Sequence, residues 1–253
     1  MVQADVSASA PGNSDPEEVA KFARMAARWW DETGEAAPLH RMNPCRLDYV
    51  TEQIAAQFGR DRRSATPFDG LAILDVGCGG GLVAEPLARL GAAVTGLDAS
   101  EDGIAVARAH AAEAGLAIDY RVGTAEALAE EGMGFDVIVA LEIVEHVPEP
   151  AAFVATLATL LRPDGILVMS TVNRTAASFM KAIVGAEFVL RWLPVGTHDW
   201  RRFLPPDTLA ALMVQAGLTI VSRTGMVYAP IADRWRLDPR DLSVNYAMAA
   251  VRA

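Results

Sequence analysis

Four glycines within five residues, Gly77 to Gly81, constrain the fold of this 253-residue chain more than any other feature. The short apolar run 73–76 precedes them, and apolar residues at helical spacing follow them at 82–90. Glycine adopts positive φ angles at no steric cost and has no Cβ to keep a ligand away from the backbone. A strand, a glycine turn and a helix in this order are typical of the first unit of a nucleotide-binding α/β fold. The sequence therefore predicts a nucleotide site at this turn.

The composition limits the classes of protein to which the chain can belong. Hydrophobic residues make up 52% of it, and a net charge of −10 excludes a general nucleic-acid binder, whose surface would be basic. Two cysteines, Cys45 and Cys78, are too few for a disulfide framework, which fits a reducing compartment. The sequence shows neither a secretory signal in residues 1–14 nor an apolar run of about 18 residues that would span a membrane. We therefore expect a cytoplasmic protein.

One domain, residues 15–253, is expected after a disordered lead, residues 1–14. Its expected parts are an N-terminal helical cap at 15–58, a linker at 59–70, a nucleotide-binding core at 70–172, an insert at 173–204, and a C-terminal helix and strands at 205–253.

The helical cap has two helix starts in its sequence. Asp15-Pro16 is a typical start, and apolar residues at helical spacing follow as far as Trp30. Asn43-Pro44 begins a second helix in the same way, which runs to about Phe58. The first helix either packs on the core or covers a ligand as a lid.

The core alternates strands with helices, which predicts a parallel sheet covered by helices on both faces. The expected strands are 72–77, 93–98, 118–122, 135–141 and 165–171, and the expected helices are 82–90, 100–114 and 150–161. Two late strands at 218–226 and 245–252 complete the sheet. Only a loop, 227–244, connects them, so the last strand is expected to be antiparallel.

An acidic residue ends the second expected strand. Asp98 lies 17 residues after Gly81, close to the spacing of about 20 residues at which a carboxylate binds the ribose hydroxyls of a nucleotide. A carboxylate suits this task because it accepts hydrogen bonds from two vicinal hydroxyls. The alternative is that Asp98 caps the helix that begins near Ser100.

The glycine spacing discriminates between nucleotides. Gly77, Gly79 and Gly81 form G-x-G-x-G, whereas the dinucleotide fingerprint needs glycine where Leu82 stands. With Asp75 before it, the turn resembles the first motif of class I S-adenosylmethionine (SAM) methyltransferases. That resemblance covers roughly residues 70–172. It implies a class I Rossmann-like fold and an adenine contact after the third strand, at Thr124, Ala125 and Glu126.

Four further stretches resemble the family of ubiquinone-biosynthesis O-methyltransferases. They are His40-Arg-Met-Asn-Pro-Cys-Arg46, Asp75-Val-Gly-Cys-Gly-Gly-Gly81, Glu142-Ile-Val-Glu-His-Val-Pro148 and Gly196-Thr-His-Asp-Trp200. The resemblance implies SAM-dependent methylation of phenol or catechol hydroxyls on a polyprenylated ring. The SAM contacts that it implies are Arg46, Asp75, Gly77, Gly79, Asp98, Ala99, Thr124, Ala125, Glu126 and Leu141. The chain departs from the family pattern in a longer linker after Arg46 and in Leu141, where methionine is expected.

Three titratable residues follow the fourth strand. Glu142, Glu145 and His146 share one face if a helical turn forms there. Two carboxylates and an imidazole at this spacing can hold a divalent cation, and the resemblance implies Mg²⁺, which would lower the pKa of the acceptor hydroxyl. The alternative is a site without metal in which His146 acts as the general base.

The insert differs in charge from the rest of the chain. Residues 174–202 contain five arginine or lysine residues and two acidic ones, a net charge of +3, among large apolar residues. Such a segment is typical of an amphipathic structure at an anionic membrane surface, which fits a polyprenyl substrate at the inner face of the membrane. The alternative is a cover over the substrate pocket.

Three other functions compete with O-methylation of a ubiquinone precursor. A nicotinamide oxidoreductase is disfavoured by Leu82, and a non-catalytic scaffold in a quinone-biosynthesis assembly is disfavoured by the intact cofactor motif. A class I methyltransferase that acts on another small or lipid molecule, including a C-methylase, has the same motifs.

Overall fold

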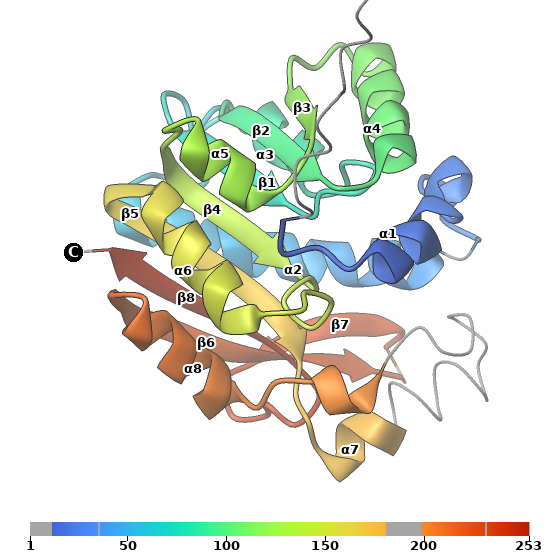
Figure 1. Cartoon of the computed structure of the whole chain (residues 1–253), viewed down its shortest axis with the longest axis vertical. Helices are drawn as coiled ribbons and strands as arrows, with labels where there is room; N and C mark the ends of the chain where they lie inside the picture. Colours follow the sequence, from blue (N-terminus) through green and yellow to red (C-terminus); the bar gives the residue numbers. More distant parts are fainter. Residues whose placement is uncertain (1–11, 35, 181–198, 231, 253) are drawn as a thin grey trace, which may run out of the picture.

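The computed structural model describes residues 12–34, 36–180, 199–230 and 232–252, and their centre is an eight-stranded sheet in the order β3-β2-β1-β4-β5-β8-β6-β7 (Figure 1). The strands are β1 (Ala72–Val76), β2 (Ala93–Asp98), β3 (Asp119–Val122), β4 (Phe135–Leu141), β5 (Leu161–Val172), β6 (Leu218–Ala229), β7 (Arg234–Asp238) and β8 (Asn245–Arg252). The first five are parallel to one another, and β8, β6 and β7 add antiparallel pairs. This confirms the predicted α/β fold with a mostly parallel sheet and an antiparallel last strand.

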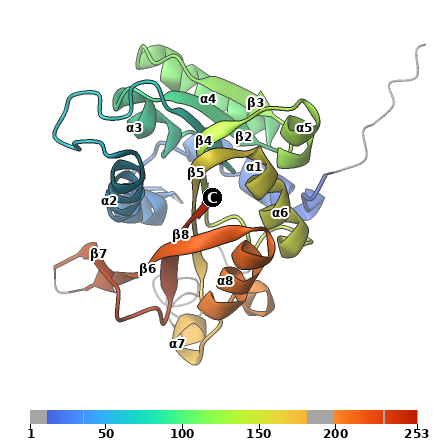
Figure 2. The ribbon, with the colours of Figure 1, turned by 90° about the vertical axis from the view of Figure 1, so that its left-hand side faces the viewer.

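Helices cover both faces of the sheet, and Figure 2 shows them on either side of it. Their bounds are α1 (Pro16–Ala23), α2 (Ala37–Phe58), α3 (Ala84–Arg89), α4 (Glu101–Glu113), α5 (Ala125–Glu130), α6 (Pro150–Leu160), α7 (Ala176–Ser178) and α8 (Pro206–Gln215), with 3₁₀ turns η1 (Ala26–Arg28) and η3 (Trp200–Arg202). Ile73 and Val137 face the core that α2, α3 and α4 complete. Leu74 and Ile138 point to the other face, where α5, α6 and α8 pack. This division follows from the alternation of side chains along a strand.

The second N-terminal helix begins earlier than the sequence pattern predicts. It starts at Ala37, and Pro38 occupies its first turn, where the missing N–H costs nothing. Pro44 instead lies inside α2, where it removes one backbone hydrogen bond and the helix continues past it. The predicted start at Asn43-Pro44 is therefore wrong, while the end at Phe58 is confirmed.

Strand β7 and helix α5 are missing from the sequence-based expectation. Strand β7 lies within the predicted loop 227–244 and pairs with an extended β6 as a hairpin. Helix α5 follows β3, and Thr124 is its N-cap, accepting a hydrogen bond from the backbone N–H of Ala127. Both elements are only five or six residues long, so their periodic pattern is short.

The first helix, unlike the second, is shorter than the sequence pattern predicts. Helix α1 ends at Ala23, and a separate 3₁₀ turn, η1, leads to Trp29 and Trp30. Asp15 caps α1 as expected, because its carboxylate accepts a hydrogen bond from the backbone N–H of Glu17.

Candidate active site

The glycine turn has the backbone conformation that its sequence predicts. Gly77, Gly79 and Gly81 all have positive φ angles, of 73°, 50° and 92°. The turn is fastened to the next strand, because the N–H of Gly77 donates to the carbonyl of Leu97 at 2.8 Å. A Cβ added to Gly79 would lie 2.3 Å from Cζ2 of Trp29, so the N-terminal segment packs directly on the turn. Only glycine satisfies both constraints at this position.

Asp98 ties the turn to the start of α4. Its Oδ2 accepts a hydrogen bond from the N–H of Gly79, and its Oδ1 accepts one from the N–H of Ser100, both at 2.8 Å. The cap of α4 is Ser100, whose hydroxyl accepts a bond from the N–H of Gly103. Each carboxylate oxygen keeps further acceptor capacity. Asp98 therefore shapes the turn and can still accept two hydroxyl groups of a ligand.

A cavity of about 700 Å³ lies at the carboxyl ends of the parallel strands. All of the site residues expected from the sequence line it: Arg46, Asp75, Gly77, Gly79, Asp98, Ala99, Thr124, Ala125, Glu126, Leu141, Glu142, Glu145 and His146. The carboxyl edge of a parallel sheet is where α/β proteins bind ligands, because glycine turns and helix N-termini meet there. The structure thus brings together residues from α2, four strand ends and the segment after β4.

Buried charges of both signs lie at the base of this cavity. The Arg46 guanidinium is buried, its Nη2 lies 3.8 Å from a carboxylate oxygen of Glu142, and burial lowers its pKa. Among the described residues, neither its Nε nor its Nη2 has a hydrogen-bond partner. Buried polar groups of this kind are costly unless a ligand satisfies them. Arg46 can therefore bind an anionic group of a ligand that enters the cavity.

Asp75 is a fully enclosed carboxyl group beside Asp98. Burial, and then the charge of Asp98, raises the pKa of Asp75 to about 7. Within the described part of the chain its Oδ2 has no hydrogen-bond partner. Ionisation of this group therefore opposes folding in the absence of a ligand.

We expect Asp75→Asn to raise the free energy of unfolding of the ligand-free protein at pH 8, by about 1 kcal/mol or more. A raised native pKa favours the protonated form, so the contribution of Asp75 to stability is full below its unfolded pKa of 3.8 and is lost as pH rises through about 7. Denaturant unfolding at pH 4.5 and pH 8 measures this, with the exposed Asp102→Asn as a control. A stability difference that is the same at both pH values would contradict the expectation.

Each of the three residues after β4 has a different hydrogen-bond partner. Glu142 has a φ of 52° and accepts a hydrogen bond from the hydroxyl of Ser170 at 2.7 Å. Glu145 is buried and accepts one from the hydroxyl of Thr171 at 2.8 Å, and its pKa is raised by burial and then by the charge of Glu142. The segment is a turn that begins in left-handed backbone, so the helical turn on which the metal expectation rests is absent. Throughout the described ranges, no three His, Cys, Asp or Glu side chains are grouped to hold a metal ion.

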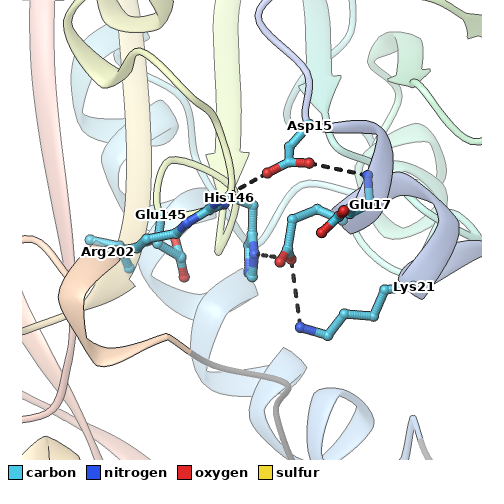
Figure 3. A network of polar contacts seen from close by, with 8 residues as sticks. Asp15, Glu17, Lys21, Glu145, His146 and Arg202 are labelled. Carbon is cyan, nitrogen blue, oxygen red and sulfur yellow. Dashed lines mark hydrogen bonds and ion pairs between the residues drawn. The ribbon is translucent and has the colours of Figure 1, made fainter.

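His146 instead pairs with the N-terminal helix. Its Nδ1 lies 2.8 Å from Oε2 of Glu18, and this hydrogen bond lowers the pKa of Glu18 to about 2. Figure 3 shows the network around the imidazole, in which Asp15 pairs with Arg202 at 3.0 Å and Lys21 extends from the same helix. An imidazole that donates its Nδ1–H keeps the lone pair of Nε2 for a proton. His146 can therefore act as a base at the wall of the cavity.

The N-terminal segment contributes residues that the sequence did not identify as part of the site. Glu18 contacts His146, and the Nδ2 of Asn13 donates to the carbonyl of Glu149. The Trp30 indole N–H donates to the carbonyl of Gly80, and the side chain of Trp29 packs against Gly79 and Gly80. The adjacent tryptophans were the signal in the sequence for this contact, and both the lid and the core-packing interpretations of the segment stay predictions.

Comparisons with known proteins agree with this geometry. A model of a methyltransferase domain matches residues 48–223. The ubiquinone biosynthesis O-methyltransferase of Dinoroseobacter shibae is 58% identical over 238 residues, which cover 94% of this chain and 96% of that protein. A protein of the same name from Ruegeria pomeroyi is 54% identical over 96% of this chain and 98% of its own length.

Solved structures show the same fold at lower identity. Magnesium protoporphyrin IX methyltransferase from Synechocystis PCC 6803, solved with bound SAH, superposes with a TM-score of 0.60 at 21% identity, over 96% of this chain and 90% of that chain. The protein PH0226 from Pyrococcus horikoshii superposes with a TM-score of 0.62 at 16% identity, over 92% and 99% of the two chains. At these identities the likeness shows the fold alone.

Proposed function

The chain belongs to the family of ubiquinone biosynthesis O-methyltransferases, and we propose that it methylates a phenol or catechol hydroxyl of a polyprenylated ubiquinone precursor with SAM as the methyl donor. The observation that carries the proposal is that one cavity joins the glycine turn and Asp98 to a base, His146. A methyltransferase that acts on another small or lipid molecule is the alternative. The kinship to O-methyltransferases over almost the whole chain favours the first substrate class.

The cofactor roles follow from the chemistry of each side chain. Asp98 accepts the ribose hydroxyls, and the segment from Thr124 to Glu126 borders the adenine. Arg46, whose Nε and Nη2 have no hydrogen-bond partner among the described residues, binds the carboxylate of the methionine portion. SAM supplies a sulfonium-bound methyl group, which moves to oxygen in one in-line displacement. The protein positions the two reactants and excludes water, so positioning contributes most of the rate.

His146 acts as the general base for the acceptor hydroxyl. Its Nε2 takes the hydroxyl proton while the oxygen forms its bond to the methyl carbon and the carbon–sulfur bond breaks. Glu18 keeps the Nδ1 proton in place across a 2.8 Å hydrogen bond.

The proposed mechanism does not include Mg²⁺, and a chelation experiment tests this. The donor set of Glu142, Glu145 and His146 does not fit a metal site in the described structure, because each side chain has a different partner. The Arg46 cation near Glu142 also competes with a metal for that carboxylate. The mechanism above therefore takes no step through Mg²⁺.

Methyl transfer from labelled SAM to a short-chain demethylated ubiquinol analogue tests the function. We expect the purified protein to methylate the catechol or the phenol analogue and to retain its activity after exhaustive chelation. No turnover with either analogue, with SAM binding intact, would contradict the substrate class. Loss of activity on chelation with recovery on addition of Mg²⁺ would contradict the metal-free mechanism.

We also propose that the protein meets its substrate at an anionic membrane surface through residues 174–202, on the cytoplasmic side. Most of this segment, 181–198, lies outside the described residues. Its described ends support the proposal, because Phe179, Met180 and Trp200 are exposed apolar residues beside the exposed Arg201 and Arg202. None of the described helices has the length and apolar character needed to cross a membrane. Membership of a quinone-biosynthesis assembly remains a prediction from the sequence.

A further inference from the structure

The cavity extends beyond the residues assigned to the donor and the base, to a wall between α2 and the β6–β7 hairpin. Five large apolar or aromatic side chains are among the residues that line it there: Leu39, Met42, Met226, Tyr228 and Trp235. Figures 1 and 2 both place β7 next to α2, and the two elements are in contact. We call this wall the hairpin subsite.

The hairpin presents one face to the cavity. Tyr228 and Trp235 are directly opposite each other in the β6–β7 register, so their side chains lie on the same face, with ring centroids 5.6 Å apart. Met226, two residues before Tyr228, shares that face and is 1% exposed. The pair of rings therefore forms a fixed apolar surface that continues into the core.

The hairpin subsite differs in chemistry from the donor end of the cavity. The donor end contains Asp98, Asp75 and Arg46, whereas the five side chains of the hairpin subsite include no carboxylate or guanidinium. Three polar residues that follow β7 also line the cavity: Asp241, Ser243 and Asn245. The hydroxyl of Tyr228 already donates to Oδ1 of Asp233 at 2.5 Å. A ligand portion bound here is held by apolar contact, for which aromatic rings and flexible thioethers are well suited.

The order of strands in the sheet separates the donor end of the cavity from the hairpin subsite. The glycine turn follows β1, and three strands, β4, β5 and β8, lie between β1 and β6. At about 4.8 Å per strand this is roughly 19 Å along the sheet. The base follows β4, nearer the donor, so a ligand that reaches the hairpin subsite extends away from the reacting oxygen.

Resting on the proposed function, we propose that the hairpin subsite binds the first isoprene units of the acceptor's tail, and that Tyr228 and Trp235 set the preference for prenylated over tail-less acceptors. The occupant follows from the continuity of the subsite with the acceptor end of the cavity and from its apolar lining. A bound ring would need polar partners for its hydroxyls, and the hydroxyl of Tyr228, the one hydroxyl among the five side chains, already donates to Asp233.

The kinetic test compares a tail-less catechol with the same catechol carrying a chain of two isoprene units. We expect Trp235→Ala to lower kcat/KM for the prenylated acceptor at least about tenfold more than for the tail-less one, mainly through KM. Tyr228→Ala acts in the same direction, and Trp235→Phe retains most of the preference. Val221→Ala, an exposed apolar residue of β6 outside the cavity, leaves the preference unchanged. Equal losses for both acceptors, or an unchanged preference, would overturn the assignment.

A binding test separates this inference from the proposed function. Calorimetry measures the affinity of the SAM-loaded protein for a two-isoprene alcohol, which has no methyl-accepting ring. We expect Leu39→Trp, which fills the subsite without deleting a core side chain, to weaken this binding at least about tenfold while SAM affinity is retained. If no catechol is methylated but this loss is observed, the proposed function fails and the apolar subsite stands. Equal affinity in wild type and variant overturns the subsite whatever the protein methylates.

Discussion

Asp98→Ala is expected to raise the Kd for SAM by about 30-fold or more, since the variant loses hydrogen bonds to a charged acceptor that are each worth about 1.5–3 kcal/mol. Two effects combine. The ribose hydroxyls lose their acceptor, and the N–H groups of Gly79 and Ser100 lose the carboxylate that holds the turn in shape. Calorimetric titration with SAM measures the change.

Two further variants serve as a graded substitution and as a control for this change. Asp98→Asn keeps the size of the side chain and one carbonyl oxygen, so we expect its Kd to lie between those of wild type and Asp98→Ala. Asp102→Ala removes an exposed carboxylate from the first turn of α4 and is expected to leave the Kd unchanged. Unchanged SAM affinity in Asp98→Ala would show that the ribose assignment is wrong.

His146→Ala is expected to lower kcat about 100-fold or more, the usual range for the loss of a general base. The affinity for SAM should stay the same, because the proposed donor contacts lie on Arg46, Asp98 and the glycine turn. Steady-state kinetics with a catechol analogue, together with SAM titration of the same variant, measures both quantities.

Imidazole in the buffer distinguishes a missing base from a disturbed fold. A small base can occupy the space that the side chain vacates, so we expect kcat of His146→Ala to rise with imidazole concentration. Lys21→Ala is the control, because it removes a 3.6 Å partner of Glu18 and leaves the imidazole contact in place. We expect its kcat to stay within about fivefold of wild type. Undiminished kcat in His146→Ala would remove His146 from the mechanism.

The donor half of the site was predictable because its signals are local. Gly77, Gly79 and Gly81 demand a turn with positive φ angles, and Asp98 follows the next strand at a fixed spacing. Parallel strands then bring these ends to one edge without further information. The structure places every cofactor residue expected from the sequence at the same cavity.

The acceptor half depends on contacts between distant parts of the chain. Glu18 reaches His146 across 128 residues, and Arg46 approaches Glu142 from α2. The metal expectation finds no support in the described structure, because it assumed helical backbone directly after β4, where Glu142 has a φ of 52°. No spacing rule reveals one left-handed residue, because tertiary contacts hold it there.

The sequence by itself therefore determined the nucleotide turn, the alternation that builds the parallel sheet, and the family. Those features rest on backbone sterics and hydrophobic period, which act over a few residues. Only the tertiary structure decided that the N-terminal helix supplies the partner of His146 and that the β6–β7 hairpin extends the cavity. Both depend on how α1, α2 and the hairpin pack around the sheet, and burial of apolar surface, which is non-directional, leaves no pattern for that in the sequence.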